Sequence, residues 1–371
     1  MKRALQRIST YDFYFWRVKK YFPFPIMIFC IFMFFSCGGG GGGTLIGSSN
    51  DSLKKPVQPV NIIMDSDMAN NADDVGDHAM LWALAARGEA NVLALILSST
   101  NDYSASCAHA IASYYGHPNV LIGANKGTIP GTYAATTSAY TQQVTNQFGT
   151  PGNSRDNYPD AATAYRQALA NAPDHSVYIV NGGFCRPMYD LLRSEPDAIS
   201  PLTGLQLVAQ KVRRAVFAAG RFPDSGSSPE GNLANDPDSA SYVVANWPTE
   251  IVWLGYDEGW NVITGPAANA DPGANPVKMA YNLHCRNGTY CANSTPAWTQ
   301  IALLYVVRGG LGTNFSVGGQ DGSTVVWGST TATPGRSIWS QTPHRQHAYL
   351  RKAISATHMA AILNPLVQWV P

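Results

Sequence analysis

Six short apolar runs that alternate with helical patterns constrain the fold of this chain most strongly. The runs are rich in Val, Ile and Leu, and they cover Val60–Asp65, Val92–Ser98, Val120–Gly123, Val177–Asn181, Ala215–Ala219 and Ile251–Gly255. Helical patterns lie between them, at Asp74–Ala86, Ser104–Tyr115, Ala161–Ala170, Pro187–Arg193 and Pro237–Ala245. This alternation predicts an α/β fold with a mainly parallel central sheet flanked by helices. Two later segments, Thr299–Arg308 and His347–Val367, are predicted to be helices.

The composition excludes two classes of protein. Of the 371 residues, 45% are hydrophobic and only 13% are charged, so the chain can bury a core and is not disordered overall. Its net charge of +1 makes nucleic acid a poor partner. We see no internal repeat and no linker after residue 56, so residues 57–371 are predicted to form one domain. In such sheets the functional site lies beyond the carboxyl ends of the strands.

The first 36 residues form a basic and aromatic leader. Six Lys and Arg residues are opposed there by Asp12 alone, and an uncharged apolar run of ten residues, Ile26–Phe35, follows. Ten residues are too few to span a bilayer core, which needs about 20. A basic segment followed by a short apolar run is typical of a secretory signal.

The end of the leader resembles the signal of bacterial lipoproteins, in which a small residue precedes an acylated Cys. Ser36 precedes Cys37 here, and Gly38–Gly43 follows directly. The resemblance implies that residues 1–37 end in a lipidated Cys37, that residues 38–56 are a flexible tether, and that the protein is exported and anchored to a membrane by its N-terminal lipid. An uncleaved anchor helix from about Tyr11 is the alternative.

Four cysteines remain after the leader. Cys285 and Cys291 flank a short polar loop, and an oxidising compartment favours a disulfide between them. A zinc site is the weaker alternative, because no second Cys or His pair lies at ligand spacing. Cys107 and Cys185 lie in apolar surroundings and are predicted to be buried free thiols.

An acidic cluster follows the first predicted strand. Asp65 and Asp67 have strand spacing, and Asp73 and Asp74 open the next helix. Carboxylates that converge at a strand end repel one another unless a cation neutralises them, and oxygen ligands suit Ca²⁺ or Mg²⁺. The alternative is a helix cap at Asp73 beside a solvated loop.

The acidic cluster, followed by further segments in a fixed order, resembles the inosine–uridine-preferring nucleoside hydrolases. The further segments are Leu97–Asn101, Tyr114–Gly116 with Val120–Gly123, Val180–Gly183, Glu230–Pro237 and Gly255–Gly259. The resemblance runs from about residue 60 to 360. It implies a Rossmann-like nucleoside hydrolase fold and hydrolysis of N-glycosidic bonds in ribonucleosides by a metal-activated water.

The resemblance also implies roles for individual residues. Asp67 would be the catalytic base and a calcium ligand, and the other metal ligands would be Asp74, the main-chain oxygen of Asn181 and residue 299. Asp65 would support the acidic loop. The residues that would bind the substrate are Asp73, Asn101, Glu230 and Asn232.

One residue departs from the family pattern. Thr299 stands where the family carries an Asp that binds both metal and sugar, so one anionic ligand is missing. We therefore expect weak calcium binding, with Asp257 or Glu258 as candidates to replace the missing acid. Asn71 also stands where related loops often carry Asp.

Two further functional classes stay open. The same pocket could belong to a catalytically weak binding protein for a nucleoside or ribosyl compound. A phosphatase with an Asp-x-Asp nucleophile is disfavoured by Ala69 and leaves Glu230–Asp236 unexplained. Among other candidates, His344 and His347 could approach the pocket, but they are predicted to satisfy a loop or cap a helix. Trp260 and Trp298 could stack on a nucleobase, but core packing is the favoured prediction for both. Base preference and a homo-oligomeric state are left open.

Overall fold

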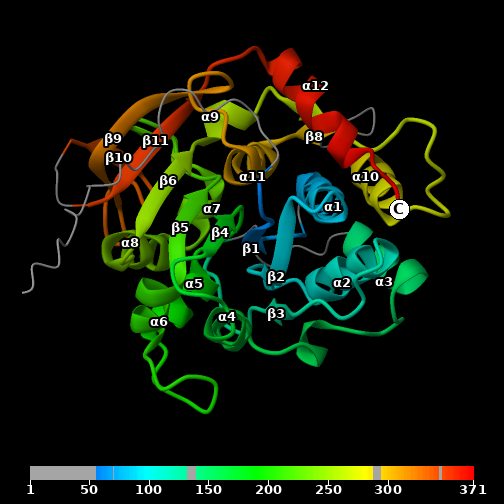
Figure 1. The fold of residues 1–371 in the computed structure, drawn as a ribbon, viewed down its shortest axis with the longest axis horizontal. Helices are drawn as coiled ribbons and strands as arrows, with labels where there is room; N and C mark the ends of the chain where they lie inside the picture. The colour runs from blue at the N-terminus through cyan, green and yellow to red at the C-terminus, as the bar shows by residue number, and fades with distance from the viewer. Residues whose placement is uncertain (1–55, 70, 132–138, 287–293, 342–344) are drawn as a thin grey trace, which may run out of the picture. The chain divides into compact units, whose positions relative to one another are not determined.

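A nine-stranded sheet runs through the centre of the computed structural model, which describes residues 56–69, 71–131, 139–286, 294–341 and 345–371. Its strands are β1 (Val60–Ser66), β2 (Ala90–Leu97), β3 (Ile122–Ala124), β4 (Val177–Asn181), β5 (Val212–Phe217), β6 (Glu250–Leu254), β9 (Phe315–Val326), β10 (Ser337–Ser340) and β11 (His347–Lys352). The strand order is β10-β9-β11-β6-β5-β4-β1-β2-β3 (Figure 1). All pairs from β11 to β3 are parallel, whereas β9 runs antiparallel to β10 and β11. The predicted mainly parallel α/β fold is therefore confirmed.

Helices cover both faces of this sheet. They are α1 (Asp73–Ala86), α2 (Ser104–Tyr114), α3 (Ala139–Phe148), α4 (Ala161–Ala170), α5 (Arg186–Arg193), α6 (Gly204–Lys211), α7 (Gly231–Asn235), α8 (Pro237–Asn246), α9 (Tyr256–Gly259), α10 (Pro276–Arg286), α11 (Trp298–Arg308) and α12 (Ala356–Val367). A small second sheet pairs β7 (Ile263–Thr264) with β8 (Thr295–Pro296). In the described part of the chain, no helix combines the length and the apolar character needed to cross a membrane.

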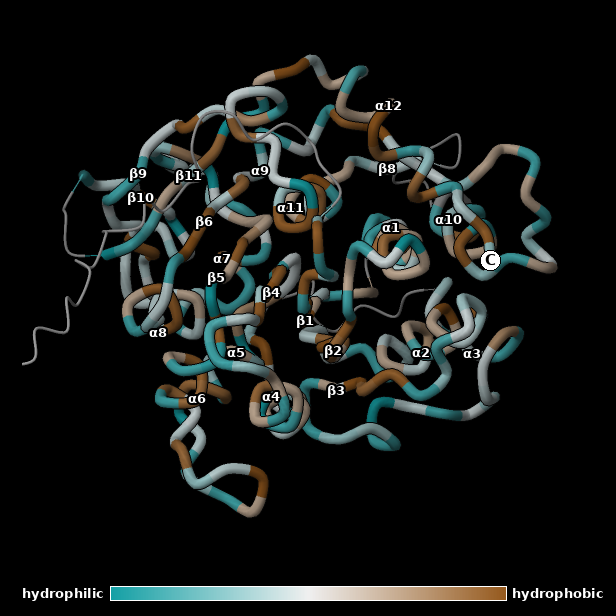
Figure 2. The backbone as a smooth tube through the Cα atoms, viewed as in Figure 1, coloured by the Kyte–Doolittle hydropathy of each residue, from teal (hydrophilic) through white to brown (hydrophobic). Residues whose placement is uncertain are grey.

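Strand side chains alternate between two separate cores. On β1, Ile62 and Met64 pack into one cluster with α1, α2, α3, α10, α11 and α12, whereas Ile63 packs into another with α4, α5, α6 and α8. This is the period-2 alternation of a strand buried on both faces. It explains why the strands are apolar throughout, as the brown segments of β2, β4 and β6 show in Figure 2. Cys107 and Cys185 are buried free thiols, one in each core, as predicted.

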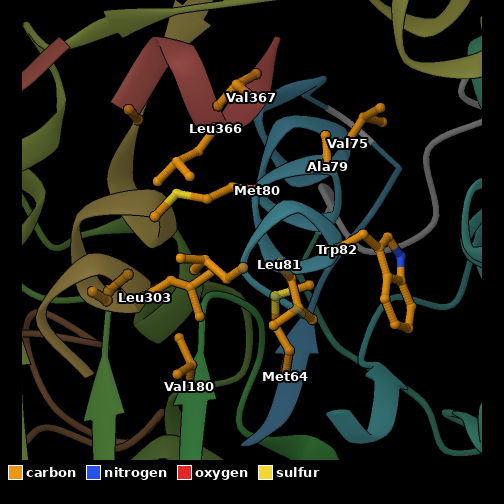
Figure 3. Close-up of a cluster of buried hydrophobic side chains, with 14 of the residues drawn as sticks. Met64, Val75, Ala79, Met80, Leu81, Trp82, Val180, Leu303, Leu366 and Val367 are labelled. Atoms are coloured by element: carbon orange, nitrogen blue, oxygen red, sulfur yellow. The ribbon is translucent and has the colours of Figure 1, made fainter. Parts of the chain in front are cut away.

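Helix α11 contributes Leu303 to the first core, where it lies near Val180 and Leu81 (Figure 3). Leu303 is fully buried, so Leu303→Ala should leave a cavity and lower the free energy of unfolding by about 2–5 kcal/mol. Leu205→Ala is the control: Leu205 lies on α6 with 42% of its surface exposed, and we expect a change within about 0.5 kcal/mol. Urea unfolding of both variants tests this, and equal losses would contradict the assignment of this core.

One predicted helix was wrong in part. Of His347–Val367, only Ala356–Val367 is helical, and His347–Lys352 forms β11. The strand lies between β6 and β9, so tertiary pairing on both sides decides its conformation. The helix begins only where the Ser355 hydroxyl accepts a hydrogen bond from the His358 amide.

The strand order reverses beside β1. From β1 the chain builds β2 and β3 on one side, and then crosses to build β4, β5 and β6 on the other. In open α/β sheets the ligand crevice lies at such a switch point, outside the carboxyl ends of the strands. The ends of β1 and β4 are therefore the expected place for a site.

Candidate functional site

A cavity of about 420 Å³ lies at the carboxyl ends of β1 and β4. It is lined by Asp67, Asn71, Asp73, Asp74, Gly182, Phe184, Ala218, Glu230, Gly231, Asn232, Asn235, Tyr256, Trp298 and Thr299. Six of the residues implied by the family resemblance therefore meet around one cavity: Asp67, Asp73, Asp74, Glu230, Asn232 and Thr299. Their placement spans more than 230 residues of sequence, so only the folded sheet brings them together.

Backbone packing at the two strand ends shapes the floor of this cavity. Asp65 and Asn181 are register partners on β1 and β4, and the Gly182 amide donates to the Asp65 carbonyl. A side chain at residue 183 would place its Cβ only 2.7 Å from the Asp67 nitrogen. Glycine is thus required there for the loop after β4 to lie against the acidic loop after β1.

The acidic loop holds three carboxylates at the cavity. Asp67 follows β1 and is half-buried, because it faces the cavity, whereas Asp73 and Asp74 begin α1 and are buried. The N-terminal turn of a helix stabilises negative charge, which explains why two acids are tolerated there. The Asp65 carboxylate lies behind the loop and accepts a hydrogen bond from the Tyr165 hydroxyl at 2.8 Å.

Burial and mutual repulsion disfavour the charged forms of these acids. Burial raises the pKa of Asp65 to about 8 and that of Asp73 to about 7. The pKa of Asp67 is raised by burial first and then by the charges of Asp73 and Glu230. The pKa of Asp74 is raised by burial and then by Asp67, Asp73 and Asp77. A bound cation would reverse each of these repulsions.

These shifts predict that the protein without a bound cation loses stability as the pH rises above neutrality. Between pH 6.5 and 8 the folded Asp65 and Asp73 still bind protons that the unfolded chain has released, since an unfolded Asp has a pKa of about 3.9. The unfolding free energy therefore falls with pH in this window. Burial lowers the pKa of His78 to about 3 and that of His347 to about 4 in the folded protein. These histidines therefore change the unfolding free energy only below about pH 6.5, the pKa of an unfolded His. Urea unfolding in a chelating buffer tests the slope, and greater stability at pH 8 than at pH 6.5 would contradict it.

A second wall of the cavity is built by the segment around α7. The Glu230 carboxylate accepts hydrogen bonds from the amides of Asn232 at 2.8 Å and Gly220 at 3.2 Å, and so caps this short helix. Asn232 donates its side-chain amide to the Gly182 carbonyl at 2.9 Å. These bonds fix Glu230 and Asn232 opposite the acidic loop.

Two aromatic side chains form a third wall. The rings of Tyr256 and Trp298 lie with their centroids 5.3 Å apart at an interplanar angle of 31°, and the Trp298 indole donates to the Tyr256 carbonyl at 3.0 Å. Trp298 thus lines the cavity and also packs against the first core, so its position is compatible with both of its predicted uses. Trp260, also predicted to lie in the core, is 51% exposed and does not line the cavity.

Two of the implied residues, Asn101 and Asn181, do not line the cavity. The Asn101 side chain accepts hydrogen bonds from the Tyr103 amide at 2.9 Å and the Thr141 hydroxyl at 3.2 Å, before α2. The Asn181 carbonyl accepts the Ala218 amide at 2.8 Å, which leaves one lone pair for a further partner. Their implied roles stay predictions.

Thr299 lines the cavity at the start of α11 and packs against Gly182. Neither candidate replacement for the missing acid lies at the cavity. Asp257 pairs with Arg221 at 2.9 Å, and Glu258 pairs with Arg351 at 2.9 Å. That expectation was wrong, because local cations already neutralise both acids.

The sequence interpretation missed a fifth acid, Asp77. It lies one helical turn after Asp73 on α1, is fully buried, and has no hydrogen-bond partner of acceptable geometry on either carboxylate oxygen. The nearby Thr299 and Gln300 side chains only partly oppose the effect of burial, which raises the pKa of Asp77. The signal was the spacing of Asp73, Asp74 and Asp77, which places them on neighbouring faces of one helical turn.

The donor set suits a hard divalent cation but is short of negative charge at the cavity wall. Carboxylate, carbonyl and hydroxyl oxygens are calcium ligands. In the described ranges, however, no three His, Cys, Asp or Glu side chains converge closely enough to hold a metal ion by themselves. Asp67 and Asp74 would need the Asn181 carbonyl and the Thr299 hydroxyl to complete a site.

The remaining predictions concern other parts of the chain. His347 is buried on β11, where its Nδ1 accepts the Thr324 amide at 3.0 Å, and it does not line the cavity. Cys37 and Cys291 lie outside the described residues, as do His344 and the side chain of Cys285. The lipid anchor and the disulfide therefore stay predictions.

No family model and no curated protein matches this sequence. Solved structures do match it in fold. A plant nucleoside hydrolase, the PpNRh1 enzyme, superposes with a TM-score of 0.60 and 14% identity over 84% of this chain and 99% of its own. An inosine–uridine-preferring nucleoside hydrolase from Bacillus anthracis gives 0.59 and 10%, over 83% and 99% of the two chains.

A third similar structure is the type III effector protein XopQ complexed with adenosine diphosphate ribose. Its TM-score is 0.58 at 13% identity, over 87% of this chain and 98% of its own. At these identities the likeness establishes the fold: the chain has a single α/β domain that matches nucleoside hydrolase structures.

Proposed function

We propose that this protein hydrolyses the N-glycosidic bond of ribonucleosides to give free base and ribose. The observation that carries the proposal is the position of Asp67, a carboxylate at the switch point of the sheet that faces a cavity shared with Asp73, Asp74 and Glu230. The cavity is large enough for a small ligand. The fold shared with nucleoside hydrolases supports the same reaction.

In the proposed reaction, Asp67 takes a proton from the water that attacks the anomeric carbon. Asp67 can do so only as a carboxylate, and the calcium proposed below would keep it ionised by offsetting the charges of Asp73 and Glu230. As the bond to the base breaks, the sugar gains oxocarbenium-like positive charge, and the neighbouring carboxylates stabilise that charge. Asp73, Glu230 and Asn232 hold the sugar, while the rings of Tyr256 and Trp298 pack against the base.

Calcium is the proposed cofactor, held by Asp67, Asp74, the Asn181 carbonyl and Thr299. When bound, it would make a coordinated water more acidic. It would also offset the repulsion between Asp67 and Asp74. We further propose that the protein is exported and carries a lipid on Cys37 that anchors it to a bacterial membrane.

The test is an assay of ribose release from a panel of purine and pyrimidine nucleosides, and of adenine release from ADP-ribose, which is included because one similar structure contains it. Each substrate is assayed with calcium and with a chelator. We expect calcium-dependent ribose release from at least one nucleoside. Failure with every substrate at millimolar calcium would contradict the proposal.

A binding protein of the same fold is the second candidate, and the neutral Thr299 favours it over a fully active enzyme. Calorimetric titration with the same nucleosides separates the two functions. Tight binding without ribose release would support the binding protein, whereas turnover would exclude it.

A further inference from the structure

Asp77 is a buried carboxylate without a compensating partner. None of its surface is exposed, and neither oxygen accepts a hydrogen bond of acceptable geometry. Among the described residues, no Lys, Arg or His forms an ion pair with it. Burying an unpaired carboxylate is costly, so a residue of this kind needs a reason to be there.

The surroundings of Asp77 point toward the cavity. Its charged neighbours are the acids Asp67, Asp73 and Asp74, which can only repel it. Its polar neighbours are the side chains of Thr299 and Gln300 on α11 and the Tyr281 hydroxyl on α10. Thr299 lines the cavity, which Asp77 does not, so it is a polar side chain through which Asp77 can act on the cavity.

We propose, building on the calcium site of the proposed function, that Asp77 supplies the negative charge that Thr299 lacks and acts on the cation through the Thr299 hydroxyl. A Thr hydroxyl has one proton and two lone pairs. In this proposal, cation binding turns this proton toward the Asp77 carboxylate, forming a hydrogen bond that the structure does not contain, and leaves both lone pairs for the cation. Donation to a carboxylate strengthens this bond and makes the hydroxyl oxygen a better ligand.

Asp77 and Thr299 thus form a two-residue equivalent of a single acidic ligand. Asp77 is a positioning residue, since it does not line the cavity and acts on the cation through Thr299. The arrangement explains two observations together: a neutral residue at the cavity wall, and an unpaired acid directly behind it. It also explains why Asp257 and Glu258 are free to form ion pairs elsewhere.

The experiment is calorimetric titration of calcium into the full chain in nonionic detergent, with Asp77→Asn, Thr299→Val and the double variant. Loss of an outer partner typically weakens metal binding by about 10- to 100-fold, and we expect about tenfold for each single variant. The double variant should be no weaker than either single one, because the two residues act as a unit. Thr299→Asp should tighten binding more in the Asp77→Asn background than in the wild type, where it would face Asp77.

Melting temperature gives a second readout that a purely structural role would not produce. Without calcium, Asp77→Asn should raise the melting temperature, because it replaces a buried acid that its neighbours repel with a neutral amide of the same shape. The increase in melting temperature on adding calcium should be smaller than in the wild type. Glu89→Gln is the control: it breaks the buried pair with Arg308 at 2.7 Å beyond the other end of α1. It should lower the melting temperature and leave calcium affinity unchanged.

Two outcomes would overturn the inference, and they differ in what they mean for the proposed function. If the wild type binds calcium and Asp77→Asn binds it equally well, Asp77 is not part of the site and the proposed function stands. If the wild type binds no calcium at millimolar concentration, the cation site of the proposed function falls together with the inference.

Discussion

Replacing Asp67 with Asn is expected to lower the rate of ribose release by roughly 10²- to 10⁴-fold, the range that a general base typically contributes. Asn has nearly the same shape but cannot accept the proton of the attacking water at neutral pH. The substitution also removes one of the two anionic residues at the cavity wall that we propose as calcium ligands. Single-turnover measurements at saturating nucleoside and calcium separate the chemical step from binding.

The control for this prediction is Asp190→Asn. Asp190 lies on α5, forms a partly exposed pair with Arg186 at 2.8 Å, and does not line the cavity. The Asp190→Asn variant should therefore release ribose at nearly the wild-type rate. A loss of less than about tenfold in Asp67→Asn would mean that another group takes the proton.

Replacing Cys37 with Ser is expected to move the protein from the membrane fraction to the soluble fraction. Ser has no thiol to acylate, and the leader would then hold the protein only by an apolar run of ten residues, too short to span a bilayer. Fractionation with detection by antibody measures the change. Cys30→Ser, within the apolar run, is the matched control and should stay at the membrane. Retention of Cys37→Ser would favour the uncleaved anchor helix.

The sequence predicted the centre of the sheet well and its far edge poorly. Strands β1 to β6 are buried on both faces and are therefore apolar, so the sequence alone identifies them as central strands. β9 was missed because Gly318, Gly319 and Gly322 do not look like strand residues. A Cβ at Gly319 would meet the ring of Trp339 at 2.7 Å, so these glycines make room for aromatic rings of neighbouring strands. No local pattern encodes that contact.

Site residues that belong to one loop could be predicted from the sequence. Site residues that only helix packing brings together could not. Asp67, Asp73 and Asp74 belong to one loop after one strand, and all three line the cavity. The relation of Asp77 to Thr299 was hidden, because 222 residues separate them and only the packing of α1 against α11 brings them together. A buried acid on an apolar helix is visible in the sequence, but its neighbours are not.

The position of β11 in the sheet has a consequence for how the chain reaches its final state. β11 follows every other described strand in the sequence, yet it lies between β6 and β9 and is the only described strand that joins the β9–β10 hairpin to the parallel strands. Until His347–Lys352 has been made, β6 is an edge strand with open hydrogen-bonding groups, and such edges recruit other chains. A nascent or truncated chain is therefore prone to aggregate. The pairing of His347–Lys352 with β6 therefore removes an open strand edge from the sheet.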